Sequence, residues 1–164
     1  MRNSAGAGST ITGDRNNTAN FFVRFNGLTG KTFDLPTEEM WEIAARAGTA
    51  SVYSWGDDMD DSYCWHDVSS AQSVGTKNPN QWGIYDMSGN AWDWCLDVSD
   101  TANLASKTTD IYTPRTTGDA SYRVERGGGC HNGVNLMPHS YRNRNTANSG
   151  WTIDGGFRLA YISE

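Results

Sequence analysis

One stretch near residue 40 is the only part of this 164-residue chain with the complete sequence pattern of an α-helix. Thr37 is a favourable N-cap, and two glutamates follow it in the first turn, where the helix dipole favours negative charge. Gly48 is a favourable C-cap, and an apolar stripe that begins at Trp41 gives the helix one face to bury. The pattern predicts a helix over residues 37–47.

The rest of the chain is rich in Gly, Asn, Thr, Ser and Trp. Such a composition favours short strands joined by long, structured loops over a helical bundle. A second, short helix is expected to end near Phe25, where Asn26 and Gly27 stop it. Strands are expected over Tyr122–Arg126 and Phe157–Ile162.

The length corresponds to one domain, predicted here as an α+β domain over residues 14–164 that follows a flexible or loop-like lead over residues 1–13. The last strand is expected to pack Phe157 and Leu159 into the core. Arg126 and Arg158, which lie beside apolar positions, need carbonyl or carboxylate partners, because a buried unpaired charge is costly.

The composition also excludes several classes of protein. A formal net charge of −6 without a basic stripe argues against a nucleic-acid partner. No apolar run approaches the roughly 20 residues of a membrane span, and no signal peptide is visible. Cys64, Cys95 and Cys130 form no CxxC pair, so we expect three reduced thiols, with one disulfide left open if the protein is secreted.

Five motifs occur in a characteristic order: LPTEEMWEIAARAG, YSWG, NQWGIYDMSGNAWDWC, RVERGGG and GGFRLAY. Together they resemble the formylglycine-generating-enzyme (sulfatase-modifying factor) domain, over about Phe21 to Ile162. The resemblance implies a variant of the C-type lectin-like fold with two helices, small antiparallel sheets and many irregular loops. It agrees with the loop-rich α+β domain that the composition favours.

The same resemblance raises a question about catalysis. The oxidase members of this family use two cysteines, five positions apart after the glycine motif, which bind copper as thiolates. The corresponding positions here are Asn132 and Met137, neither of which supplies a thiolate. We therefore expect no catalytic residues, no copper and no enzymatic activity, because a fold without its site residues does not carry the function.

A subgroup of the fold gives a sharper hypothesis. The variable proteins of diversity-generating retroelements are rewritten at template adenines in their C-terminal segment, and Asn codons are favoured targets. Here residues 130–154 are Asn-rich with interspersed aromatics, a composition typical of evolved binding surfaces. The resemblance thus implies a variable binding segment, with Trp65, His66 and Trp92 as possible neighbours. Its candidate ligand-binding residues are Cys130, His131, Asn132, Gly133, Val134, Asn135, His139, Tyr141, Asn143, Asn145, Asn148, Trp151 and Asp154.

The resemblance also implies a structural calcium ion at the turn GIYDMSGNAWDW. Carried over by position, its ligands would be the side chains of Asp86 and Asp93 and the backbone carbonyls of Gly89 and Ala91, a suitable oxygen set. The alternative is that the two aspartates cap turns and pair with arginine. A second calcium site of the family, near residues 64–66, is expected to be lost.

The function expected from these observations is non-catalytic recognition of a protein or a surface glycan. The resemblance implies an extracellular, cell-surface or phage-particle location. One alternative is a formylglycine-generating oxidase that acts on a peptide cysteine. Another is a structural module without its own ligand, which predicts a large exposed apolar patch. The oligomeric state is left open.

Overall fold

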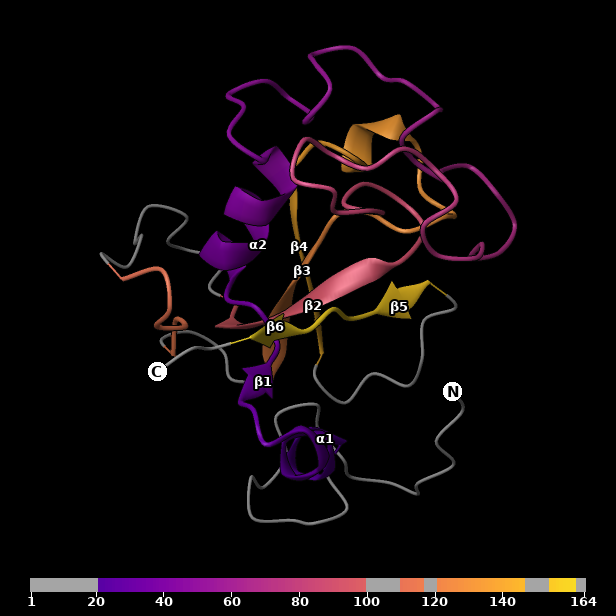
Figure 1. The fold of residues 1–164 in the computed structure, drawn as a ribbon. Helices are drawn as coiled ribbons and strands as arrows, with labels where there is room; N and C mark the ends of the chain where they lie inside the picture. The colour runs from indigo at the N-terminus through magenta and orange to yellow at the C-terminus, as the bar shows by residue number, and fades with distance from the viewer. Residues whose placement is uncertain (1–20, 100–109, 117–120, 147–153, 162–164) are drawn as a thin grey trace.

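The computed structural model describes residues 21–99, 110–116, 121–146 and 154–161 (Figure 1). The α-helices are α1 (Phe21–Thr29) and α2 (Glu38–Arg46), and one 3-10 turn, η1, covers Val134–Leu136. The strands are β1 (Phe33–Asp34), β2 (Trp92–Val98), β3 (Tyr122–Arg126), β4 (Arg142–Thr146), β5 (Gly155–Gly156) and β6 (Ala160–Tyr161). Both α-helices have nine residues, and no described helix is long and apolar enough to cross a bilayer.

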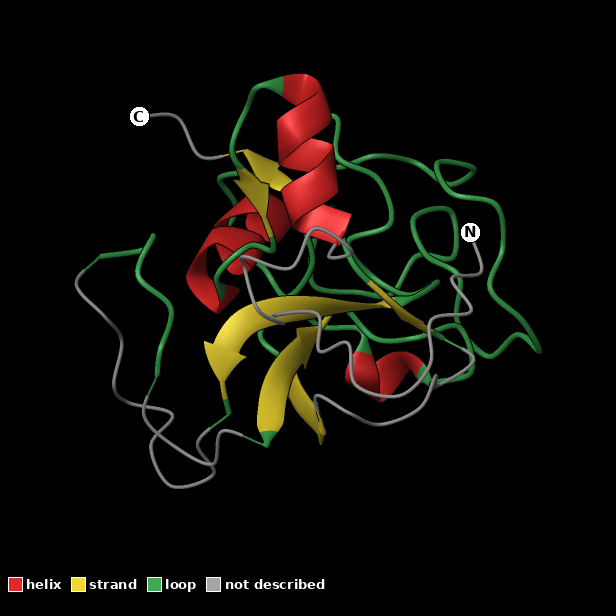
Figure 2. Ribbon diagram, turned by 90° about the horizontal axis from the view of Figure 1, so that it is seen from below, coloured by secondary structure: helices red, strands yellow, loops and turns green. Residues whose placement is uncertain are grey.

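The strands form two small sheets (Figure 2). The larger has the order β4-β3-β2-β5, in which β2 and β5 run parallel and the other neighbours antiparallel. The smaller pairs β1 with β6 antiparallel. Two helices, small sheets and a large share of loop confirm the expected loop-rich α+β architecture.

Helix α2 forms where its sequence pattern predicts. The hydroxyl of Thr37 accepts a hydrogen bond from the backbone N–H of Met40 at 3.2 Å, and so caps the first turn. The C-terminus differs from the expectation: the left-handed cap residue is Ala47, with φ of 47°, and Gly48 follows with φ of 90°. The N–H of Ala47 donates to the carbonyl of Ile43, so this residue takes up the turn that glycine was expected to make.

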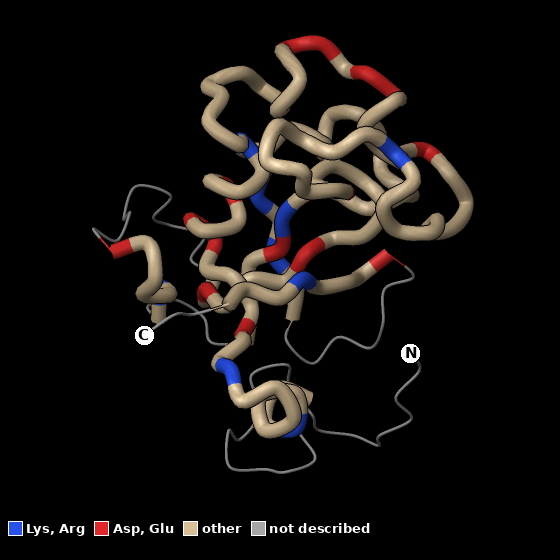
Figure 3. The backbone as a smooth tube through the Cα atoms, in the orientation of Figure 1, with Lys and Arg blue, Asp and Glu red and all other residues tan. Residues whose placement is uncertain are grey.

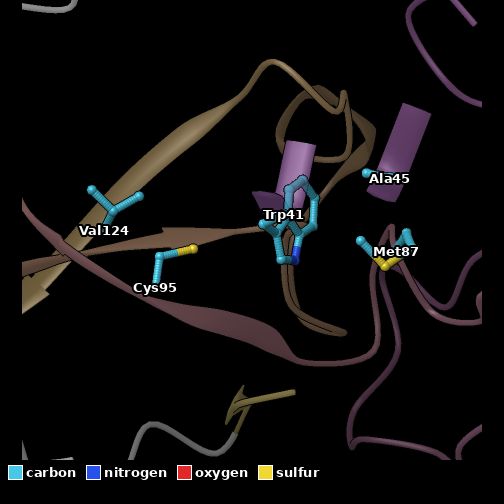
Figure 4. Packing of buried hydrophobic residues seen from close by; sticks show 5 residues of the cluster. All are labelled: Trp41, Ala45, Met87, Cys95 and Val124. Carbon is cyan, nitrogen blue, oxygen red and sulfur yellow. The ribbon is translucent and has the colours of Figure 1, made fainter. Parts of the chain in front are cut away.

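The core lies between α2 and the larger sheet (Figure 4). Trp41 and Ala45 of α2 are fully buried against Cys95 of β2 and Val124 of β3, with Met87 from the preceding loop. The indole N–H of Trp41 donates to Asp93 Oδ2 at 2.8 Å, which satisfies the polar atom of the largest core side chain.

Alternation along the strands separates two faces of this sheet. On the inner face, toward α2, lie Asp93, Val124 and Arg126 with their neighbours. The next residue along each strand is Trp94 in β2, Glu125 in β3 and Asn143 in β4. These three are cross-strand partners, and alternation places their side chains on the outer face. The consequence is that β4, within the predicted binding segment, contributes to both faces.

The inner face carries a dense set of ion pairs around Glu38, where Figure 3 shows charged positions of both signs beside α2. Arg142 Nε lies 2.8 Å from Glu38 Oε1, and Arg115 pairs with Glu38 and with Asp97. Burial raises the pKa of Glu38, and the surrounding arginines counteract this. Because these side chains come from distant parts of the chain, the network ties α2 to β2, β4 and the 110–116 segment.

Arg126 and Arg158 have the expected partners. Arg126 donates to the carbonyls of three consecutive residues that begin at His139, and pairs with Glu42. Arg158 Nε donates to Asp93 Oδ2 at 2.6 Å, and its Nη2 donates to the carbonyl of Asp86 at 3.0 Å. Both predictions are confirmed.

Two predictions about the chain ends are wrong. Helix α1 continues through Asn26 and Gly27 to Thr29, because the Asn26 side chain bonds both backbone groups of Phe33 instead of ending the helix. Within the described residues, β6 at Ala160–Tyr161 is the only part of the predicted last strand that forms, and Phe157 and Leu159 are 48% and 38% exposed. Their side chains are outside the buried core, and Phe157 packs against the phenyl rings of α1.

The α1 end of the molecule is therefore an exposed aromatic patch. Ring contacts run continuously from Tyr161 through Phe33, Phe25 and Phe21 to Phe157. No residue of α1 is buried, and Leu28 is 85% exposed. We call this surface the aromatic end.

The described part of the predicted binding segment, residues 130–146 and 154, is more regular than the aperiodic loop that the sequence predicts. It contains η1 and the strand β4, whose sequence RNRNT has no apolar alternation. Strand β4 forms because its backbone pairs with β3 from Tyr122↔Thr146 to Arg126↔Arg142. Backbone pairing with β3, which packs on the core, therefore makes this segment a strand although its own sequence does not predict one.

Removal of the Arg126 guanidinium is expected to be strongly destabilising. Arg126→Met leaves three carbonyls without this donor, and Glu42 keeps only its ion pair with Arg46, so the free energy of unfolding should fall by about 3–5 kcal/mol. Chemical denaturation measures the change. Arg144→Met is the matched control, because Arg144 is exposed and contacts the Tyr122 ring, so it should change stability by less than about 1 kcal/mol. Equal effects of the two substitutions would contradict the role given to Arg126.

Candidate functional site

The predicted binding segment begins against a loop that lies far away in sequence. The N–H of Val68 donates to the carbonyl of Cys130 at 2.8 Å, and the N–H of Asp67 donates to the carbonyl of Asn132 at 3.1 Å. Trp65 forms a bridge to Gly89, and the His66 ring lies between two carboxylates, those of Asp61 and Asp67. The segment is therefore joined by backbone contacts to the two residues that directly follow the expected neighbours Trp65 and His66.

A thiol–imidazole contact lies at this junction. His131 Nε2 lies 2.9 Å from the carbonyl oxygen of Ser69, which only accepts, so Nε2 carries a hydrogen and donates it. His131 Nδ1 lies 3.1 Å from Cys130 Sγ and 3.9 Å from Asp154 Oδ2. Sequence reasoning did not find this pair. The adjacency of the two residues was visible, but not their relation to Asp154.

Cys130 and His139 differ from the expectation that they contact ligand. Both residues are fully buried, so neither side chain forms part of the exposed surface. Burial raises the pKa of the Cys130 thiol, and the nearby Asp154 adds to this. The thiol therefore stays protonated at neutral pH.

His139 lies among the rings of Trp41, Tyr53 and Trp55, each edge-on to it at 6.1–6.3 Å between centroids. Both ring nitrogens are buried without a hydrogen-bond partner. Burial, followed by the positive charges of Arg46 and Arg126, lowers the pKa of His139 to about 4. His139 is therefore a neutral core residue at ordinary pH.

The two positions that correspond to the copper cysteines have structural contacts. Asn132 Oδ1 accepts a hydrogen bond from the N–H of Gly129 at 2.8 Å and closes a turn. Met137 is fully buried in a cluster with Tyr53 and Cys64. Burial raises the pKa of Cys64 to about 11, so this thiol is not a thiolate either. These residues do not fit a copper site made of two thiolates.

The outer face of the sheet brings together Glu125, Asn143, Asn145 and Asp154, which we call the outer-face cluster. Asn143 Nδ2 donates to Glu125 Oε2 at 3.1 Å, and Asn145 also bonds this carboxyl group. Glu125 is 1% exposed, and its Oε1 has no partner. Burial and then the negative charge of Asp154 raise the pKa of Glu125 to about 7.

Sequence reasoning named three members of this cluster and missed Glu125. In the sequence, Glu125 is one polar residue in the alternating strand YRVER, a position that normally faces solvent. Its burial follows from the pairing with β4 and from Asp154, both distant in sequence. No local signal indicates it.

The remaining predicted contacts have varied environments. His131, Val134 and Asn135 are exposed, and Gly133 is partly exposed beside them. Tyr141 lies with its ring centroid 6.2 Å from that of Trp92. Asn148 and Trp151 lie outside the described residues.

The proposed calcium ligands are in contact with protein groups. Asp93 Oδ2 accepts from Trp41 and from Arg158, as in the alternative in which the aspartate pairs with arginine. Asp86 Oδ2 accepts from the N–H of Gly75 at 2.8 Å, while its Oδ1 is buried without a partner. Across the described parts of the chain, no three His, Cys, Asp or Glu side chains form a metal-holding group. Calcium binding with the Gly89 and Ala91 carbonyls stays a prediction.

Glu125 and His139 should impose opposite pH dependences on stability. His139 titrates near 6.5 when unfolded and about 4 when folded, so its contribution is lost as pH falls from 6.5 to 4. Glu125 titrates near 4.5 when unfolded and about 7 when folded, so its contribution is present below pH 4.5 and lost as pH rises to 7. Each change is worth about 3 kcal/mol.

Two variants separate these effects in denaturation series from pH 4 to 8. His139→Leu should gain stability relative to the parent protein as pH falls. Glu125→Gln should lose stability relative to the parent as pH falls. Parallel curves for parent and both variants would contradict the assigned environments.

Residues 7–162 match the family described as the sulfatase-modifying factor enzyme 1-like domain. The chain is 34% identical to the formylglycine-generating enzyme of Streptomyces coelicolor, over 97% of this chain and 57% of that protein. It is 33% identical to the enzyme of that name from Thermomonospora curvata, over 94% of this chain and 59% of the relative. The chain thus spans little more than half the length of these relatives.

Two solved structures are also similar. Treponema denticola variable protein 1 has a TM-score of 0.69 and 32% identity, over 79% of this chain and 47% of that one. PvdO from Pseudomonas aeruginosa has a TM-score of 0.77 at 22% identity, over 90% and 59% of the two chains, which shows a shared fold. The first agrees with the variable-protein subgroup that the motifs indicate. The chain belongs to the family of sulfatase-modifying factor enzyme 1-like domains.

Proposed function

We propose that this chain is a non-catalytic recognition domain, the diversified variable protein of a diversity-generating retroelement. Residues 130–154 would contact a protein or a surface glycan, outside the cell or on a phage particle. The observation that carries the proposal is the environment of Asn132 and Met137. One closes a turn and the other fills the core, where the oxidase relatives need two thiolates.

The anchoring of the segment supports this proposal. Arg126 holds its middle through three carbonyls, and β3 holds β4 through backbone pairing. Backbone contacts do not depend on side-chain identity, so exposed positions such as Val134 and Asn135 tolerate substitution without loss of the fold. The similarity to a variable protein adds support from an independent comparison.

Deep sequencing of the 3′ end of the gene, in a population grown from one cell, tests this function. We expect substitutions at adenine-containing codons between Cys130 and Asp154, with Gly127, Arg142 and Phe157 unchanged. Oxygen uptake with copper and a cysteine-containing peptide should be absent. An invariant segment, or steady oxygen uptake that the peptide requires, would sink the proposal.

The aromatic end favours a second candidate, a structural module inside a larger assembly. Monomeric proteins seldom leave a continuous apolar patch of this kind uncovered. If this candidate holds, Leu28→Glu should reduce association of the protein in sedimentation velocity. Val74→Glu, at an equally exposed site outside the patch, should leave association unchanged. A monomeric parent protein would remove self-association as an explanation for the patch.

A further inference from the structure

Among the described residues, the outer-face cluster lacks the ion pairs with arginine that the inner face has. On the inner face, the buried carboxylates of Glu38, Asp93 and Asp97 each pair with an arginine. On the outer face, Glu125 is equally buried, but no Lys or Arg within the described ranges forms an ion pair with it. Asn143 donates to its Oε2 and Asn145 also bonds the carboxyl group, but Oε1 has no partner among the described residues.

An unpaired buried carboxylate oxygen is costly, because it has given up water without gaining a donor. Asp154 increases the cost, since a second negative charge lies close to Glu125. Asn143 and Asn145 surround the same group and are only half-buried, so the cluster reaches the surface beside the segment proposed to bind ligand. The arrangement lacks one component, a positively charged hydrogen-bond donor.

We propose that the outer-face cluster binds a cationic side chain, an ammonium or guanidinium group, presented by a protein partner. This inference rests on the proposed function and adds the chemistry of its ligand. The cation would donate to Glu125 Oε1 and offset the repulsion between Glu125 and Asp154. The amide oxygen of Asn143, whose nitrogen already bonds Glu125, is available as a further acceptor.

Other ligand chemistries fit less well. A neutral sugar hydroxyl would donate to Oε1 but would leave the two negative charges uncompensated. Calcium takes about six to eight oxygen ligands, whereas Asn143 turns its amide nitrogen to Glu125 and the described residues place no third acidic or histidine side chain here. The net charge of −6 also favours approach of a basic partner.

The test uses Nα-acetyl-lysinamide as the probe and Nα-acetyl-norleucinamide as its uncharged match. Both are titrated into the full chain and followed by NMR at the backbone amides and at the Glu125 carboxyl carbon. We expect the lysine probe to shift the signals of Glu125, Asn143 and Asn145. The norleucine probe should leave them in place.

Two variants define the site. Glu125→Gln keeps an oxygen for Asn143 but removes the charge, and should weaken binding of the lysine probe by at least about tenfold. Asp58→Asn removes an exposed carboxylate from the separate acidic loop at residues 57–61 and should leave binding unchanged. The unperturbed amide spectrum of each variant verifies that it is folded.

Several results would overturn the proposal. These are equal binding of the two probes, equal binding by Glu125→Gln and the parent protein, or shifts confined to residues 57–61 and lost in Asp58→Asn. If calcium chloride shifts the NMR signals of the cluster and the lysine probe does not, the site binds a metal ion instead of a cationic side chain.

If the gene is diversified and the lysine probe does not bind, the ligand class is wrong and the proposed function stands. If the probe binds and the gene is invariant, the cationic site stands and the diversification does not.

Discussion

The guanidinium of Arg126 is the interaction on which the rest of this structure depends. It extends from the central strand β3, contacts Glu42 of α2 and donates to three carbonyls in the middle of the 130–154 segment. A single side chain therefore connects the core helix, the sheet and the candidate binding surface. Arginine suits this role because its planar fork supplies several donors in fixed directions and keeps its charge when buried. The segment can differ in sequence at exposed positions while its path stays fixed.

The same strands give the two faces of the sheet different electrostatic environments. The inner face places carboxylates and arginines together and closes them beneath α2. The outer face collects Glu125, Asn143, Asn145 and Asp154 without a cation. Strand alternation produces this division, because β3 turns Arg126 to one side and Glu125 to the other. Stability thus resides on the inner face, whereas the outer face retains a buried acceptor that no described group satisfies.

Prediction from the sequence succeeded where the signal was local. Thr37, the first-turn glutamates and the Trp41 stripe located α2, and alternation located β3. It failed where a distant partner decided the outcome. Asn26 bonds Phe33 and so does not end α1, and Phe157 packs on the phenyl rings of α1 at the surface. Strand β4 has no apolar period, and only its register with β3 makes it a strand.

The sequence by itself determined the family, the core helix and the absence of two thiolates at positions 132 and 137, because these follow from residue identity and short-range spacing. Only the tertiary structure decided which members of the 130–154 segment are buried and which are exposed. It placed Cys130 against His131 and Asp154, enclosed His139 among aromatic rings and left Glu125 Oε1 without a donor. The physical reason is that burial and hydrogen-bond satisfaction are properties of contacts between distant residues, and no single stretch of sequence contains both partners.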